Sequence, residues 1–355
     1  MRALSDTLTR MTAFRDTVSA MGGRPGSDRL TELKGFGGNP GALRALAYVP
    51  DTLPRHAPLV VVLHGCTQDA AEYDLGSGWS ALAQQAGFAL LFPEQARANN
   101  FNLCFNSFEP SDTRRGRGEV ASIRQMIEKM IATHGLDRRR VFVTGLSAGG
   151  AMANVLLASY PEVFAGGAVI AGLPFGVAGS PLEAFDRMRG HGGPELEALP
   201  GLVRKASSHK GPWPALSVWH GGGDHTVNPA NGEALLHQWR GVHRLDEAPS
   251  HTDAQAGHTR RTWHDAKGRQ VLEHVLVEGM GHGVPLKPDG APGGGVSGAY
   301  MLDVGLASTV AIARSWDLLD KAPAKPRTAK AARPAPANPL LGVIEDALRT
   351  AGLMR

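Results

Sequence analysis

One short stretch has the residue types and spacing of a nucleophile turn. It reads Gly145-Leu146-Ser147-Ala148-Gly149, after a β-branched and aromatic run over 140–144 and before an alanine- and leucine-rich run over 151–160. Strand, sharp turn and helix are the context in which G-x-S-x-G exposes its serine above a sheet. Such a turn strains the backbone, and the helix start favours nearby negative charge. We therefore predict Ser147 as a nucleophile; the alternative is a chance match in a chain with 45 glycines.

A serine hydroxyl needs a base, and the base needs an acid that orients it. One known chain order is serine, then acid, then histidine. Asp224 and His282 follow Ser147 in that order, each after a predicted strand, and His282 lies between two glycines. The alternatives are a turn aspartate at 224 and a surface-loop histidine at 282. Their competitors lie on a predicted polar helix, in a polar loop, along strands or elsewhere after Ser147: Asp246, Asp253, His220, His225, His237, His243, His251, His258, His264 and His274.

Cleavage of an ester or amide also needs donors for the oxyanion that forms at the carbonyl. One donor should be the backbone N–H of Ala148, directly after the nucleophile. The second should come from the turn that follows the apolar run 59–63, which makes the Cys66 N–H the expected donor. His64 and Gly65 would allow this turn, although a simple strand-ending turn would use them as well.

The elements that must position these residues alternate between strand and helix. We predict strands at 59–63, 88–92, 140–144, 164–171 and 215–219, and a strand pair at 260–264 and 271–277; the predicted helices cover 79–85, 119–134, 151–160, 182–188, 233–242 and 305–319. This alternation indicates an α/β fold with a mainly parallel sheet covered by helices on both faces. Runs at 30–34 and 43–49, separated by a glycine-rich turn, predict an antiparallel hairpin at the N-terminal edge of the sheet. In such sheets the site forms at the carboxyl ends of the strands.

The predicted domain organisation has four parts. Residues 1–28 should form an amphipathic helix and a hinge, and residues 29–320 the catalytic domain, with a glycine- and proline-rich insertion at 172–212 near the site. Residues 321–338 are rich in lysine, alanine and proline, which favours an extended linker. Residues 339–355 regain an amphipathic pattern and should form a terminal helix.

Composition excludes several classes of function. Five of the positive charges lie in the tail between 321 and 333, and subtracting them from the net charge of +4 leaves −1, so we expect no nucleic-acid partner. No apolar run reaches the ~20 residues of a membrane span, and charges interrupt the N-terminus, so we expect no secretory signal and a cytoplasmic location by default. The two cysteines have no zinc-ligand spacing, and we expect no metal and no cofactor. The oligomeric state stays open.

Several further motifs make the chain similar to the poly(3-hydroxybutyrate) depolymerase and esterase family, a branch of the α/β-hydrolases that includes feruloyl and acetyl-xylan esterases. The matching stretches lie between about residues 30 and 319 and include Leu63-His64-Gly65-Cys66-Thr67-Gln68, Asn102-Leu103-Cys104-Phe105-Asn106, Arg115-Gly116-Arg117-Gly118-Glu119, Val143 to Met152, Tyr160-Pro161, Phe164-Ala165, Asp224 with Thr226-Val227, and Gly281-His282-Gly283-Val284-Pro285. The resemblance implies hydrolysis of carboxylic esters through an acyl-enzyme. It implies the same roles for Ser147, Asp224 and His282.

The resemblance also implies features of the substrate groove. The family's two cysteines near the site would be Cys66 and Cys104, either disulfide-bonded or, in the alternative reading, two buried thiols. We expect His64, Asn106, Ser107 and Phe108 to line the groove. Family members often carry an aromatic residue directly after the Cys-x-Asn, where this chain has Ser107, which weakens an expectation of polymer stacking. By this likeness the location would be extracellular or periplasmic instead.

The leading expectation is therefore a serine esterase for short poly- or oligo-hydroxyalkanoate esters. A feruloyl or acetyl esterase acting on plant polysaccharide, or a general short-chain carboxylesterase, is the alternative within the enzymes. Outside them, a protein that binds polymer granules through its basic tail and terminal helix remains open.

Overall fold

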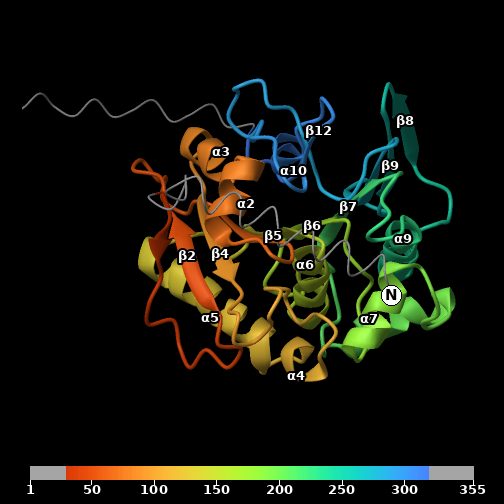
Figure 1. The fold of residues 1–355 in the computed structure, drawn as a ribbon, viewed down its shortest axis with the longest axis horizontal. Coiled ribbons are helices and arrows are strands. Elements are labelled where there is room, and N and C mark those ends of the chain that lie inside the picture. Colours follow the sequence, from red (N-terminus) through yellow and green to blue (C-terminus); the bar gives the residue numbers. More distant parts are fainter. Residues whose placement is uncertain (1–28, 320–355) are drawn as a thin grey trace, which may run out of the picture. The chain divides into compact units, whose positions relative to one another are not determined.

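The computed structural model describes residues 29–319 of the chain, and the statements below concern that part. It contains a 10-stranded sheet with the order β1-β2-β4-β3-β5-β6-β7-β10-β9-β8 (Figure 1). The strands are β1 (Thr31–Glu32), β2 (Arg44–Tyr48), β3 (Leu59–Leu63), β4 (Ala89–Glu94), β5 (Val141–Leu146), β6 (Gly166–Ile170), β7 (Ala215–Gly221), β8 (His251–Gln255), β9 (His258–His264) and β10 (Gln270–Val277).

The strands from β4 to β10 in that order run parallel, and antiparallel pairs flank them at both ends. The predicted mainly parallel sheet and its N-terminal edge hairpin, now β1 and β2, are confirmed. The central strands are continuous apolar runs, and every residue of β3, β4 and β5 is buried. Such strands need cover on both faces.

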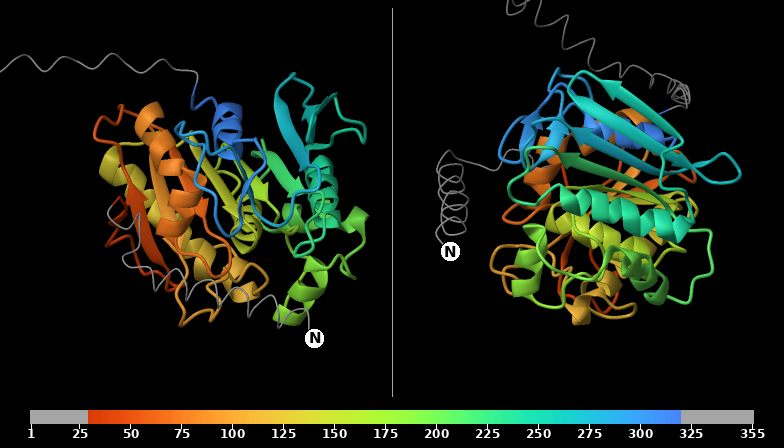
Figure 2. Two further views of the ribbon diagram at one scale, coloured as in Figure 1. Left: turned by 45° about the horizontal axis from the view of Figure 1, so that its top comes forward. Right: turned by 90° about the vertical axis from the view of Figure 1, so that its right-hand side faces the viewer.

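Helices supply that cover (Figures 1 and 2). They are α2 (Ala70–Ser77), α3 (Trp79–Ala86), α4 (Pro110–Thr113), α5 (Gly118–His134), α6 (Ala148–Ser159), α7 (Pro181–Met188), the 3₁₀ turn η1 (Leu196–Ala198), α8 (Leu199–Lys205), α9 (Ala230–His243) and α10 (Ser308–Ser315). Alternate residues of β3 enter two separate cores. Val61 packs in a core with apolar residues of α5, α6 and α9, whereas Val60 packs in one with residues of α2, α3 and α10.

The structure corrects several local predictions. The segment around His251 and Asp253, predicted as a polar loop, is strand β8, which pairs only with β9 and is mostly exposed. An exposed edge strand carries no alternation of apolar residues, so its sequence resembles a loop. Helices α2, α4 and α8 were not predicted, nor was the small parallel sheet of β11 (Val284–Leu286) and β12 (Met301–Asp303). The last predicted helix is shorter, since α10 covers Ser308–Ser315 only.

The predicted insertion at 172–212 lies between β6 and β7 and contains α7, η1 and α8. Its predicted helical patch is observed as α7, with Ser180 capping the helix through a bond from the Glu183 N–H. α8 packs against α9, which anchors the insertion beside the second half of the sheet. The predicted parts 1–28, 321–338 and 339–355 lie outside the described residues.

Candidate active site

Ser147 occupies a sharp turn between two central elements. β5 ends at Leu146 and α6 begins at Ala148, so Ser147 is the single residue between them. Its backbone has φ +57° and ψ −117°, and its N–H donates to the Ile170 carbonyl at 2.9 Å. A non-glycine residue held at positive φ indicates local strain that the surrounding structure must impose. The geometry is that of a serine raised at the carboxyl end of the sheet.

Two glycines make this turn possible. A Cβ at Gly145 would lie 2.5 Å from the carbonyl carbon of Gly149, and a Cβ at Gly149 would lie 2.4 Å from the carbonyl oxygen of Leu63. Both neighbours are backbone atoms that cannot move aside. Because these side chains are missing, the start of α6 packs closely against the end of β3. The Ser147 turn therefore lies next to the turn that contains Cys66.

The turn after β3 is fixed by its own hydrogen bonds. The Gly65 N–H donates to Gln68 Oε1 at 2.9 Å, and the Thr67 N–H donates to the Asn102 carbonyl at 2.6 Å. Within residues 29–319, neither the Cys66 N–H nor the Ala148 N–H donates a hydrogen bond. Two unused backbone donors on facing turns are the arrangement that an oxyanion requires.

A disulfide joins Cys66 and Cys104. Of the two states that the sequence left open, bonded cysteines or buried thiols, the structure has the first. The bridge ties the long segment between β4 and α5 to the turn that carries the Cys66 N–H. The wall of the site is therefore covalently attached to one of its candidate donors.

His282 lies beside Asp224. His282 Nδ1 is 2.7 Å from Asp224 Oδ2, and the Asp224 side chain is fully buried. The other carboxylate oxygen, Oδ1, accepts the N–H groups of Thr226 at 2.8 Å and Val227 at 2.9 Å. Because a carboxylate accepts, His282 Nδ1 carries a proton and Nε2 is left to act as a base.

The structure places Ser147, Asp224 and His282 after β5, β7 and β10, at the predicted carboxyl edge. No hydrogen bond joins Ser147 Oγ to His282 in the described part of the chain. Bonds between a nucleophile and its base are often long without substrate and shorten when substrate binds. Asp224 and His282 are therefore already paired, and Ser147 lies after β5, two strands away from β7 in the sheet.

The glycines between His220 and Asp224 let the histidine loop approach. A Cβ at Gly221 would lie 2.2 Å from the Met280 carbonyl oxygen. The Gly222 N–H donates to the Val277 carbonyl at 2.8 Å, and the Gly223 N–H to the Met280 carbonyl at 2.9 Å. These bonds fasten the loop that carries His282 to the turn that carries Asp224.

Asp224 is held as a carboxylate. Burial alone would raise its pKa, but contacts from His220 and His282 and the Val227 N–H outweigh burial, and the pKa of Asp224 lies below its ordinary value. An acid that stays ionised can orient an imidazole and stabilise the imidazolium.

The structure contradicts one of the four predicted groove residues. His64 was expected to line the groove, but only 1% of it is exposed, and its ring nitrogens contact the Gly65 carbonyl at 2.8 Å and the Gln95 N–H at 3.2 Å. His64 therefore supports the turn after β3 from the interior of the protein, and burial lowers its pKa. Asn106, Ser107 and Phe108 are partly exposed, and the Asn106 side chain accepts from Asn100 within its own loop, so their groove role stays a prediction.

Sequence reasoning missed residues that support or border the site. The Gln95 side-chain amide donates to the Cys104 carbonyl at 3.0 Å and to Glu119 at 2.5 Å. Tyr300 stands edge-on to His282, with ring centroids 5.9 Å apart. Glu119 belongs to the stretch Arg115-Gly116-Arg117-Gly118-Glu119 and could have been singled out from it, whereas no motif in the sequence marks Gln95 or Tyr300.

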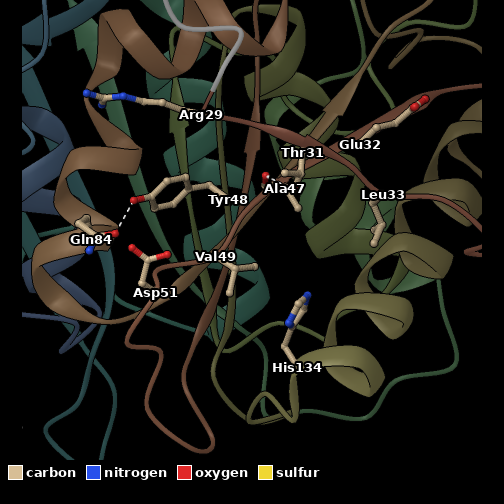
Figure 3. Close-up of a pocket in the computed structure, with 10 residues that line it drawn as sticks. All are labelled: Arg29, Thr31, Glu32, Leu33, Ala47, Tyr48, Val49, Asp51, Gln84 and His134. Atoms are coloured by element: carbon tan, nitrogen blue, oxygen red, sulfur yellow. Dashed lines mark hydrogen bonds between the residues drawn. The ribbon is translucent and has the colours of Figure 1, made fainter. Parts of the chain in front are cut away.

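A separate pocket of about 590 Å³ lies at the β1–β2 edge, and none of the predicted site residues lines it (Figure 3). Its lining combines charged, polar and apolar side chains: Arg29, Thr31, Glu32, Leu33, Ala47, Tyr48, Val49, Asp51, Gln84 and His134. Within 29–319, no group of histidine, cysteine, aspartate and glutamate has a metal-binding arrangement, and no helix is long and apolar enough to cross a membrane.

Comparison with known proteins identifies the family. Residues 43–264 match the model of the esterase PHB depolymerase family. The chain is 44% identical over 296 residues to poly(3-hydroxyalkanoate) depolymerase C of Paucimonas lemoignei, covering 82% of this chain and 70% of that protein. It is 30% identical over 267 residues to feruloyl esterase B of Talaromyces funiculosus, covering 72% of this chain and 73% of that protein.

The fold has solved counterparts as well. The acetyl xylan esterase from Aspergillus awamori superposes with a TM-score of 0.66 at 29% identity, over 71% of this chain and 93% of that one. The sheet described above is thus an α/β-hydrolase fold, and the activity common to these relatives is hydrolysis of carboxylic esters. The chain belongs to the esterase PHB depolymerase family and is a serine esterase.

Proposed function

We propose that Ser147, His282 and Asp224 are the catalytic triad and that short hydroxyalkanoate esters are the substrates. The observation that carries the triad is the buried bond between His282 Nδ1 and Asp224 Oδ2, at the same sheet edge as the strained Ser147 turn. This arrangement leaves His282 Nε2 as the base for the serine hydroxyl.

The reaction would proceed in two halves. His282 Nε2 takes the Ser147 Oγ proton as Oγ attacks the ester carbonyl, and the Cys66 and Ala148 N–H groups stabilise the oxyanion. The alcohol leaves with the proton from His282. Water then attacks the acyl-enzyme and gives its proton to the same nitrogen. The second oxyanion collapses, the bond between the acyl carbon and Ser147 Oγ breaks, and His282 returns the proton to Oγ as the acid leaves.

Similarity to the Paucimonas lemoignei depolymerase supports the choice of substrate. Two partly exposed positions, Ser107 and Phe108, follow the disulfide-bonded Cys104 and would face the acyl chain. A small residue at 107 suits a short, flexible aliphatic ester better than a rigid aromatic one.

A second candidate is a feruloyl or acetyl esterase acting on plant polysaccharide. It is favoured by the likeness to the feruloyl esterase of Talaromyces funiculosus and the acetyl xylan esterase of Aspergillus awamori. It differs from the first proposal in substrate only and uses the same triad.

The test compares wild type with Ser147→Ala on p-nitrophenyl butyrate, a turbid poly(3-hydroxybutyrate) suspension, hydroxybutyrate oligomers, methyl ferulate and acetylated xylan. We expect wild type to hydrolyse butyrate and hydroxybutyrate esters, and Ser147→Ala to keep only a residual ~10³-fold acceleration over the uncatalysed rate. Substantial turnover by the variant would refute the triad. Faster release of ferulate or acetate than of hydroxybutyrate would favour the second candidate.

A further inference from the structure

A second histidine contacts the proposed catalytic acid from within the protein. His220, in β7, is fully buried, and its Nε2 lies 3.5 Å from Asp224 Oδ2 and 2.9 Å from the Val227 carbonyl oxygen. Both neighbours are acceptors, so Nε2 of His220 carries a proton. Asp224 Oδ2 therefore lies between two imidazole N–H groups, one from His282 and one from His220.

The other nitrogen of His220 has no protein partner. Nδ1 is buried and makes no hydrogen bond, and it lies against Gly232 of α9, where an added Cβ would be 3.1 Å away. With Nε2 protonated, Nδ1 of the neutral ring is an acceptor. A fully buried acceptor without a donor needs an explanation, because such groups are rare in folded proteins.

A matching donor comes from the adjacent strand. In the β7–β10 ladder, His220 pairs with Leu276 and Val218 pairs with His274, so His220 and His274 share one face as diagonal neighbours. Arg261 Nη2 lies 2.7 Å from His274 Nδ1. Since arginine only donates, His274 Nδ1 accepts and Nε2 carries the proton.

His274 therefore holds a buried donor that also lacks a partner at Nε2. Burial, then Arg261 and His220, lowers the pKa of His274 to about 3, which keeps the ring neutral and in this tautomer. The unpaired donor of His274 and the unpaired acceptor of His220 complement each other on one buried face. That face is closed by α9, from which Glu233 pairs with Arg261.

We propose that His220 and His274 are positioning residues that act through Asp224 to set the basicity of His282. His274 Nε2–H polarises His220 through space or through one bridging water, and His220 Nε2–H takes a share of the negative charge on Asp224 Oδ2. This inference rests on the catalytic roles proposed above. It assigns a function to two buried histidines outside the triad.

Because His220 takes a share of the negative charge on Asp224, Asp224 stabilises the protonated form of His282 less than it would alone. The backbone bonds of Thr226 and Val227 already fix Oδ1, so losing His220 leaves the carboxylate in place with more charge on Oδ2. That charge would stabilise the imidazolium of His282 and move the acid limb of kcat/KM to higher pH. The titratable and charged groups along this line are Glu233, Arg261, His274, His220, Asp224 and His282, and Tyr300 stands edge-on to His282.

The test uses two polar replacements of similar size. In His220→Gln the amide nitrogen can reach the former Nε2 position and still donate to Asp224, whereas in His220→Asn it ends near the former Nδ1 position. The full-length protein is assayed on p-nitrophenyl butyrate from roughly pH 5 to 9, spanning histidine titration. We expect the acid limb of His220→Asn to move up by about half to one pH unit and His220→Gln to restore the wild-type limb.

His274→Asn and the double variant test the coupling, because the Asn amide does not reach the former Nε2 position. We expect a smaller upward shift in His274→Asn, a wild-type limb in His274→Gln, and no further shift when His274→Asn is added to His220→Asn, because His274 acts through His220. The matched controls are His243→Asn and His243→Gln, since His243 lies on α9 and contacts the Pro214 carbonyl at 3.1 Å instead. If His220→Asn does not fold, the His274→Asn limb alone decides.

An unmoved or lowered limb in His220→Asn, or additive shifts in the double variant, would overturn the proposal. Lower melting temperatures with an unmoved limb would show a structural role only. Loss of turnover in Ser147→Ala tests the triad independently, so failure of this inference leaves that assignment standing.

Discussion

At the scale of single residues, the wall of the site contains a carboxyl group in an unusual state. Glu119 is 1% exposed and accepts from Gln95 at 2.5 Å and from the Asn106 N–H at 3.0 Å. Burial, with a smaller contribution from Asp112, raises its pKa from 4.5 to about 8 despite these bonds. Glu119 is therefore largely protonated at neutral pH and holds the long loop without a buried charge.

This state predicts a pH-dependent stability difference. A group whose pKa is higher when folded stabilises the protein below its unfolded value and loses that contribution as pH rises through its folded value. The melting temperature of wild type relative to Glu119→Gln should thus be highest below about pH 4.5 and should decline toward pH 8 and above. Thermal melts of both proteins across this range check the prediction, and a constant difference would contradict it.

The residues that could be predicted from sequence are those with a local signature. Ser147 lies in a motif, and Asp224 and His282 follow strands in the expected chain order. Gln95 and Tyr300 could not be found, because their roles depend on contacts with residues far away in sequence. The stretch His220-Gly221-Gly222-Gly223-Asp224, which begins in β7, did hold a signal for His220, since it places this histidine four residues before Asp224.

At the scale of elements, the close approach of two turns is the sharpest requirement. Gly221→Ala would place a Cβ 2.2 Å from the Met280 carbonyl oxygen and push away the loop that carries His282. A shift of about 1 Å in a catalytic group can cost ~10²-fold, so we expect kcat/KM to fall by at least that factor. Gly281→Ala, on the same loop, has nothing within 4 Å of its added Cβ and serves as the control. Equal activity in the two variants would refute the packing argument.

The disulfide predicts a measurable loss of stability when it is removed. The Cys66–Cys104 bridge closes a loop with a sequence separation of 38, for which we expect roughly 2–4 kcal/mol of unfolding free energy. Urea unfolding of wild type and of the Cys66→Ala, Cys104→Ala double variant measures it. Reductant should lower the stability of wild type and leave the variant unchanged; insensitivity of wild type would contradict the bridge.

The elements that sequence analysis missed lack the periodic apolar pattern that packing against a core imposes. β8 is an exposed edge strand, so no core imposes alternation on it. α2 contains glycine and aspartate and depends on its Asp69 cap, and α8 is short and stabilised by packing on α9. Long amphipathic α5 and the fully buried β3 were predicted well because their pattern comes from the core they enter.

At the scale of the whole molecule, every proposed catalytic group lies within residues 29–319. A variant that ends at Lys321 should therefore hydrolyse p-nitrophenyl butyrate with kcat/KM within about twofold of wild type, well under 1 kcal/mol of transition-state stabilisation. Kinetics of the two proteins side by side check this. A large loss on the soluble ester would mean that the C-terminal residues take part in the site.

The same assays on polymer separate binding from catalysis. If wild type and Ser147→Ala sediment with poly(3-hydroxybutyrate) and the shortened chain does not, the tail has a role in adsorption. If all three sediment alike, the tail has no role in adsorption.

The two sets of glycine contacts hold the proposed catalytic groups in two preassembled bodies. Gly149 lets the Ser147 turn pack onto the end of β3, and Gly221 lets the His282 loop pack onto the end of β7. β6 runs between these bodies, and the insertion at 172–212 leaves the sheet from its end. The insertion contacts both bodies, since the Asn228 N–H donates to the Met188 carbonyl at 2.7 Å and a Cβ at Gly172 would lie 2.9 Å from the carbonyl carbon of Gly150. Any exchange of that insertion would therefore have to keep these two contacts for both bodies to stay in place.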